Sequence, residues 1–154
     1  MEDVFSLNQV LEKSLWREVE SQLLYINLRM IAGTAAARET FRELVDQELG
    51  HQTLLERHLL GELGDLPGAG KVIDLKIVEG LNQPEIRRDM PMKDIFLLAA
   101  QREKLAHEFY LGLAAVYRGE ARRLLEGLAG QELAHKQRLE LLYSETAFPQ
   151  TDGG

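Results

Sequence analysis

The sequence predicts an all-α protein, folded as an antiparallel four-helix bundle. Two observations lead to this fold class. Apolar residues recur at helical spacing over most of the chain and do not alternate as they would in strands. Glycine and proline, which break helices, gather in one central region and are sparse elsewhere. The 154 residues, 45% of them hydrophobic, suffice for one domain with a real core, so residues 1–154 are expected to form a single domain.

Helices are expected over residues 4–32, 34–63, 92–117 and 120–145. Gly33 interrupts the first helical pattern, and Thr34 is a suitable N-cap for the next helix. Gly119 interrupts the pattern again between the third and fourth helices. Because both connections are short, the first two helices should form one antiparallel hairpin and the last two another.

The connection over residues 64–91 is long for a loop within a bundle. We expect it to cross back along the bundle, so that the second and third helices run parallel. Its apolar run from Val72 to Val78 is expected to hold this crossover against the side of the bundle.

Composition excludes several classes of function. The net charge of −7 makes nucleic acids and anionic membranes poor partners. The absence of cysteine excludes disulfides, thiolate metal sites and thiol catalysis. No run of 18 apolar residues predicts a membrane span, and residues 1–7 do not resemble a signal peptide, so a cytoplasmic protein is expected.

The two halves of the chain contain related segments. The second expected helix contains Gln47-Glu48-Leu49-Gly50-His51, and the fourth contains Gln131-Glu132-Leu133-Ala134-His135. A Leu-Glu pair follows each segment at the same offset. We interpret this pattern as an internal two-fold repeat.

Carboxylates lie on the apolar faces of all four expected helices. Glu48 and Glu132 share such faces with His51 and His135, which follow three residues later, and Glu103 shares one with Phe96 and Tyr110. On the first helix two acids compete for the inner position. Glu20 lies near Trp16, Val19 and Leu23, whereas Glu18 lies with more polar neighbours, so Glu20 is predicted to face inward.

Four inward carboxylates need counter-charge, because an unpaired buried carboxylate costs several kcal/mol. Lysine and arginine are largely absent from the inner faces. The four glutamates and two histidines also fall at one depth in the bundle, at about 1.5 Å of rise per residue. One Glu from each of two helices and Glu-x-x-His from each of the other two form the ligand pattern of dimetal carboxylate bundles. The predicted metal ligands are therefore Glu20, Glu48, His51, Glu103, Glu132 and His135.

These segments, together with Glu20-Ser21-Gln22 and Gln101-Arg102-Glu103-Lys104, resemble the ferritin-like superfamily and its rubrerythrin-like branch. The resemblance covers most of residues 8–145. It implies a di-iron centre in which Glu48 and Glu132 would be bridging or chelating carboxylates, with Mn as an alternative metal. The other ligands it implies are two terminal carboxylates, Glu20 and Glu103, and one nitrogen ligand for each metal, His51 and His135. Gln47 and Gln131 would each orient the opposite histidine.

The resemblance also implies an oxidoreductase that reduces H2O2 or O2, and a homodimer. Because no cysteine is present, a rubredoxin domain is missing, so a rubredoxin-type protein or another external donor would supply the electrons. A ferroxidase or iron-storage protein, a dimanganese catalase-type enzyme and a metal-free bundle of Glu–His salt bridges remain alternatives.

Other polar residues near the inner faces receive weaker interpretations. Tyr110 either hydrogen-bonds a ligand carboxylate or is a plain core tyrosine, and Tyr25 receives no special role. His58 and His107 are interpreted as structural. Trp16 is a candidate for the helix face through which a homodimer would form.

Overall fold

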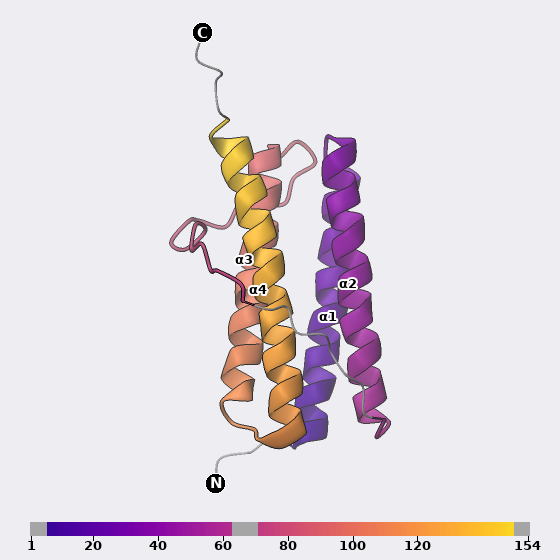
Figure 1. Ribbon diagram of the computed structural model, residues 1–154. Helices are drawn as coiled ribbons and strands as arrows, with labels where there is room; N and C mark the ends of the chain where they lie inside the picture. Colours follow the sequence, from indigo (N-terminus) through magenta and orange to yellow (C-terminus); the bar gives the residue numbers. More distant parts are fainter. Residues whose placement is uncertain (1–5, 63–70, 150–154) are drawn as a thin grey trace.

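The computed structural model describes residues 6–62 and 71–149, and within these residues it contains four α-helices and no strands (Figure 1). The helices are α1 (Leu7–Ile31), α2 (Ala35–Leu59), α3 (Met92–Ala114) and α4 (Gly119–Ala147). The all-α fold class is thus confirmed. The helix bounds agree with the expected ones to within a few residues, and the largest difference is at the C-terminal end of α2.

Local capping explains where the first two helices begin. Ser6 caps α1 in a capping box, in which its hydroxyl accepts from the backbone of Gln9 and the Gln9 side chain accepts from the backbone of Ser6. Thr34 caps α2 as predicted, since its hydroxyl accepts a bond from the backbone N–H of Ala37 at 3.1 Å.

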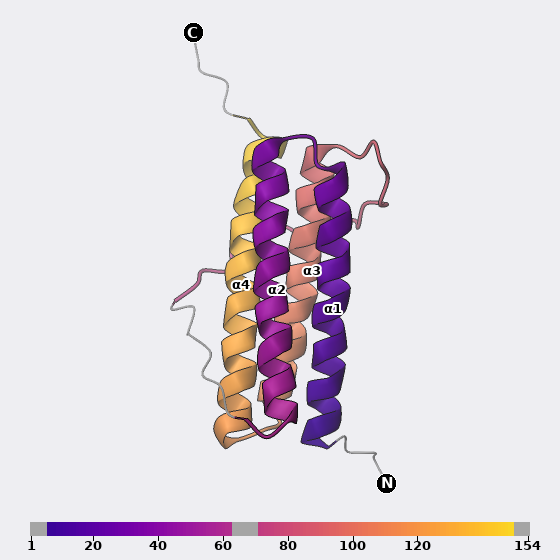
Figure 2. The ribbon, with the colours of Figure 1, turned by 90° about the vertical axis from the view of Figure 1, so that its right-hand side faces the viewer.

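The helices pair as two hairpins, α1 with α2 and α3 with α4, and the closest backbone approaches lie within each hairpin. Helices α1 and α4 run in one direction, whereas α2 and α3 run in the other (Figure 1). In Figure 2 α2 stands beside α4, and α1 stands beside α3.

Two apolar clusters lie along the bundle. The first contains Phe41, Phe96 and Leu139, and the second contains Leu55, Leu125 and Leu128. Buried polar residues lie between them in sequence on each helix, so a polar layer separates the two halves of the core.

Residues 71–91, which we call the strap, connect to α3 and pack on the α3–α4 hairpin. The expected apolar anchor is confirmed at Val78, which is buried, but Ile73 is exposed. Polar contacts provide the remaining attachment: the buried carboxylate of Glu140 on α4 accepts from the backbone N–H groups of Ile77 and Val78. Lys136, also buried, contacts Asp74, Glu79 and Glu140 at 2.6, 2.8 and 3.1 Å. The ammonium group of Lys136 therefore provides counter-charge to these three carboxylates.

No helix among the described residues is both long and apolar enough to cross a membrane. Some expectations lie outside the described residues: the helical assignment of residues 4–5 and 63, residues 64–70 of the crossover, and the tail beyond residue 149.

Candidate metal centre

Six buried side chains meet in the polar layer between the hairpins: Glu18, Glu48, His51, Glu103, Glu132 and His135. Each helix contributes a glutamate, and α2 and α4 each add a histidine three residues later, on the same face. The inward orientation predicted for Glu48, His51, Glu103, Glu132 and His135 is confirmed by their burial.

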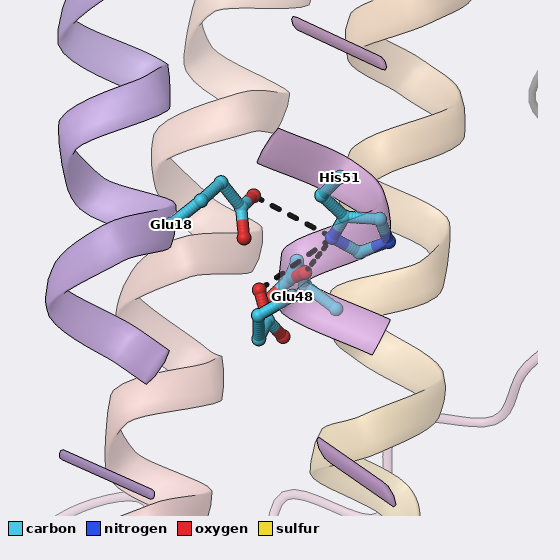
Figure 3. Close-up of side chains that lie close together, drawn as sticks. Glu18, Glu48 and His51 are labelled. Carbon is cyan, nitrogen blue, oxygen red and sulfur yellow. Dashed lines mark ion pairs between the residues drawn. The ribbon is translucent and has the colours of Figure 1, made fainter. Parts of the chain in front are cut away.

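The prediction for α1 is wrong, because Glu18 takes the inner position and Glu20 does not. Glu18 is only 2% exposed. It points from α1 toward His51 on α2 (Figure 3). The side chain of Glu20 is 65% exposed and lies 3.5 Å from Arg102. The apolar residues around Glu20, Trp16 and Leu23 among them, are themselves exposed, so an apolar neighbourhood was a misleading guide to burial.

The six residues form two overlapping groups that could each hold a metal ion. One group is Glu18, Glu48, His51 and Glu132, and the other is Glu48, Glu103, Glu132 and His135; the donor atoms within each lie within 4.8 Å of one another. Donors at about 2.0–2.2 Å from one ion span about 4 Å, so small side-chain movements would close either group around a metal.

Glu48 and Glu132 belong to both groups. Each group is completed by one further glutamate and one histidine of a single hairpin, so the arrangement has an approximate two-fold symmetry.

Both imidazoles present Nδ1 to the carboxylates. The Nδ1 atom of His51 lies 2.9 Å from Glu132 and 3.5 Å from Glu18, and Nδ1 of His135 lies 3.3 Å from Glu48. The two rings are nearly parallel, with centroids 6.0 Å apart.

Gln131 contacts the outer edge of His51, as expected from the sequence. Its amide oxygen bonds Nε2 of His51, and because this oxygen only accepts, Nε2 must donate. That bond leaves Nδ1 of the neutral ring free as a ligand. Gln47, the corresponding residue on α2, is exposed.

Two tyrosines hydrogen-bond the two glutamates that each belong to a single ligand group, and each does so from the opposite hairpin. Tyr110 of α3 donates to Glu18 of α1 at 2.5 Å, and Tyr25 of α1 donates to Glu103 of α3. Tyr110 therefore bonds a site carboxylate, although not the one on its own helix. Tyr25 was missed in the sequence, but a signal was present: Glu18 and Tyr25 are seven residues apart, as are Glu103 and Tyr110.

Many polar atoms of this cluster have no hydrogen-bond partner. Among the described residues, buried side-chain atoms without a hydrogen bond include both carboxylate oxygens of Glu48, one oxygen each of Glu18, Glu103 and Glu132, and Nδ1 of both histidines. Each Nδ1 lies close to a carboxylate but is not aligned with it as a hydrogen bond requires. Such atoms are rare in folded proteins, since each costs about 1–3 kcal/mol. Their concentration at one place fits a site that binds cations through these atoms.

Burial and mutual repulsion disturb the protonation of the carboxylates. Burial, with the nearby Glu48, raises the pKa of Glu18 to about 8. Burial, with Glu103 and Glu48, raises the pKa of Glu132 well above its usual range. Burial opposes ionisation of Glu48 too, but contacts with Glu18 and the two histidines lower its pKa well below the usual range.

The histidines respond in the opposite sense. Burial by itself lowers the pKa of His135, but the neighbouring Glu103 and Glu48 outweigh it and raise the value to about 9. The pKa of His51 is likewise raised, because Glu132, Glu18 and Glu48 outweigh its burial. Without metal, protons therefore supply counter-charge to this site at neutral pH.

His107 has a structural contact, as expected: its Nδ1 bonds the backbone carbonyl of Ala129 at 2.8 Å. His58 is not part of either ligand group.

Comparisons with known proteins add the fold but no function. No family model matches the chain, and no curated protein matches it. A solved structure of a hypothetical protein from Pyrococcus furiosus is similar, with a TM-score of 0.68 and 22% sequence identity; the match covers 96% of this chain and 94% of that one. This chain therefore shares a whole-chain fold with that protein.

Proposed function

We propose that this protein is a ferritin-like dimetal carboxylate protein, with the strap as part of the long crossover between α2 and α3. The observation that carries the proposal is the pair of ligand groups that share Glu48 and Glu132. Shared carboxylates are what two closely spaced metal ions require. Four ionised glutamates would also balance the charge of two divalent cations when both histidines are neutral.

The donor set favours iron or manganese. Carboxylates and imidazoles suit these metals, whereas soft metal sites use thiolates, which this chain lacks. We propose two Fe ions as the resident metals, with Mn as the alternative.

We further propose that the protein is an oxidoreductase that reduces H2O2 or O2. A bound pair of redox-active metals would supply two electrons, and H2O2 with two electrons and two protons gives two molecules of water. An external electron donor, such as a rubredoxin-type protein, would restore the reduced state.

The residues around the cluster prepare it for this chemistry. Tyr25 orients the carboxylate of Glu103, Tyr110 orients that of Glu18, and Gln131 fixes the tautomer of His51. The apolar clusters on both sides limit access of water to the reacting centre.

Anaerobic titration with Fe(II) tests the metal site. We expect two tightly bound ions per chain, and loss of both in the Glu48→Ala/Glu132→Ala variant, which removes the shared ligands. Failure of the parent protein to bind stoichiometric metal would mean that the cluster is a metal-free network of salt bridges.

The reaction is tested separately on the loaded protein. Stoichiometric H2O2 should oxidise the bound Fe(II) without forming a mineral. Growth of a mineral core within a large assembly would favour iron storage, and O2 evolution from H2O2 by the Mn-loaded protein would favour a catalase. If neither H2O2 nor O2 oxidises the reduced site, the oxidoreductase proposal fails.

A further inference from the structure

An arginine stands directly before each of the two glutamates that belong to a single ligand group. Arg17 precedes Glu18 on α1, and Arg102 precedes Glu103 on α3, 85 residues later. Helices α1 and α3 stand side by side (Figure 2). Both arginines reach the surface there, since Arg17 is half-buried and the side chain of Arg102 is 19% exposed. The internal repeat therefore places a cation just outside the polar layer on each of these helices.

Each guanidinium crosses from its own helix to the other one. Arg102 of α3 donates to the hydroxyl of Ser21 at 3.0 Å and to the backbone carbonyl of Arg17 at 3.1 Å, both on α1. The guanidinium carbon of Arg17 lies 4.2 Å from the centre of the Phe109 ring on α3, a cation–π contact. The two cations are thus neighbours on one surface. We call this surface, formed by Arg17, Arg102 and Phe109, the arginine seam.

The charge of the arginine seam is poorly compensated. Within the described part of the chain, Glu20 is the one carboxylate that forms an ion pair with either arginine, and its exposed side chain lies 3.5 Å from Arg102. Arg17 has no ion pair there, and its Nε atom is buried without a hydrogen-bond partner. Burial and the neighbouring Arg102 lower the pKa of Arg17, because both oppose its charged form.

The unused hydrogen-bond donors indicate what kind of ligand is missing. A guanidinium has five N–H donors in a planar fork. Arg102 uses its Nε and one Nη group within the protein, whereas Arg17 finds no acceptor among the described residues. Forks of this kind bind the oxygens of carboxylates and phosphates in pairs. The net charge of −7 repels a large acidic molecule from most of the protein surface, so a small free anion fits better.

We propose that the arginine seam binds one small oxyanion of the inorganic phosphate type. Oxygens of the anion would accept from Arg17 and from the unused Nη group of Arg102, and the anion would supply the counter-charge that Glu20 provides only in part. The seam contains none of the metal ligands, and its arginines are in place without metal. The proposal therefore does not depend on the proposed function.

Calorimetric titration of the metal-free full chain with inorganic phosphate tests the proposal, with sodium chloride at matched ionic strength as the reference. We expect saturable binding of one phosphate per chain. Arg17→Gln should weaken this binding at least about tenfold, the loss expected for hydrogen bonds to a charged group. Arg17→Lys keeps the charge but not the fork, so its affinity should be intermediate.

Arg42→Gln is the matched control. Arg42 already pairs with Glu39 and Asp46 at 2.6 and 2.7 Å, so this variant should bind phosphate as the parent protein does. Circular dichroism shows whether each variant keeps its helices, and Arg17→Lys provides the comparison if Arg17→Gln does not fold.

Three results would overturn the proposal: no saturable binding of phosphate, unchanged binding after Arg17 is replaced, or an equal loss in folded Arg42→Gln. A short oligoglutamate peptide is the last titrant. If this peptide bound through Arg17 while phosphate did not, the surface would receive the carboxylates of an acidic partner, and the free oxyanion would be the wrong ligand.

Discussion

Replacing Glu18 with glutamine should make the metal-free protein more stable and, at the same time, reduce the number of metal ions that it binds. The pKa of Glu18 is about 8, against an ordinary value of 4.5. At pH 7 the folded metal-free protein therefore keeps a proton on a carboxyl group that the unfolded chain leaves ionised. At 1.36 kcal/mol per pH unit, this difference costs about 3 kcal/mol.

Glutamine has nearly the same shape, is neutral without binding a proton, and can still accept the bond from Tyr110. We expect Glu18→Gln to raise the free energy of unfolding of the metal-free protein by up to about 3 kcal/mol at pH 7, or roughly 5–10 °C in Tm. The same change should reduce the metal content from two ions per chain to one, because only one ligand group contains Glu18.

Thermal unfolding with a chelator and elemental analysis after metal loading provide the two readings. Glu20→Gln is the matched control, since the exposed Glu20 should affect neither reading. The reasoning would be refuted if Glu18→Gln destabilised the metal-free protein or kept both ions, or if Glu20→Gln lost one.

Three further predictions concern the tyrosines beside the site, the histidine His135 within it, and the lysine that attaches the strap. Tyr25→Phe and Tyr110→Phe each remove the donor from a buried carboxylate, and should weaken metal binding about 10–100-fold in a competition titration; unchanged affinity would contradict a positioning role. The pKa of His135 is raised from 6.5 to about 9, so protonation of this histidine stabilises the metal-free protein fully below pH 6.5, and this stabilisation is lost as the pH rises through 9. The Tm of the metal-free protein should therefore fall between these pH values, and a rise in Tm would contradict the prediction. Lys136→Met leaves three carboxylates without their cation and should cost about 3–5 kcal/mol in denaturant unfolding, whereas Lys104→Met, at a partly exposed pair, should cost less than about 1 kcal/mol.

Much of the fold follows from the sequence because its signals are local. Helical periodicity and the cap at Thr34 determine where helices form, and a glutamate three residues before a histidine places both on one face. The inward positions of Glu48, Glu103 and Glu132 could be predicted in this way, since each lies among apolar residues that are themselves buried.

The choice between Glu18 and Glu20 failed for a physical reason. Periodicity shows that a helix has an apolar face, but α1 has two, and only tertiary contacts distinguish the face against the core from the face toward solvent. The repeated seven-residue spacing between glutamate and tyrosine would have identified Glu18. The polar attachment of the strap to Glu140 and Lys136 could not have been predicted, because it joins residues about 60 positions apart without a local pattern.

The two ligand groups overlap, so both hairpins are needed to complete either group. Each group takes three residues from one hairpin and a single shared glutamate from the other, so neither half of the chain holds a complete set. Two identical hairpins related by a two-fold axis would provide the same six ligands and the same crossed tyrosines. The single chain thus has the same arrangement of ligands that two identical hairpins would form as a symmetric dimer. Its halves are free to diverge only where they do not meet: one has acquired a strap, and the other an apolar exterior.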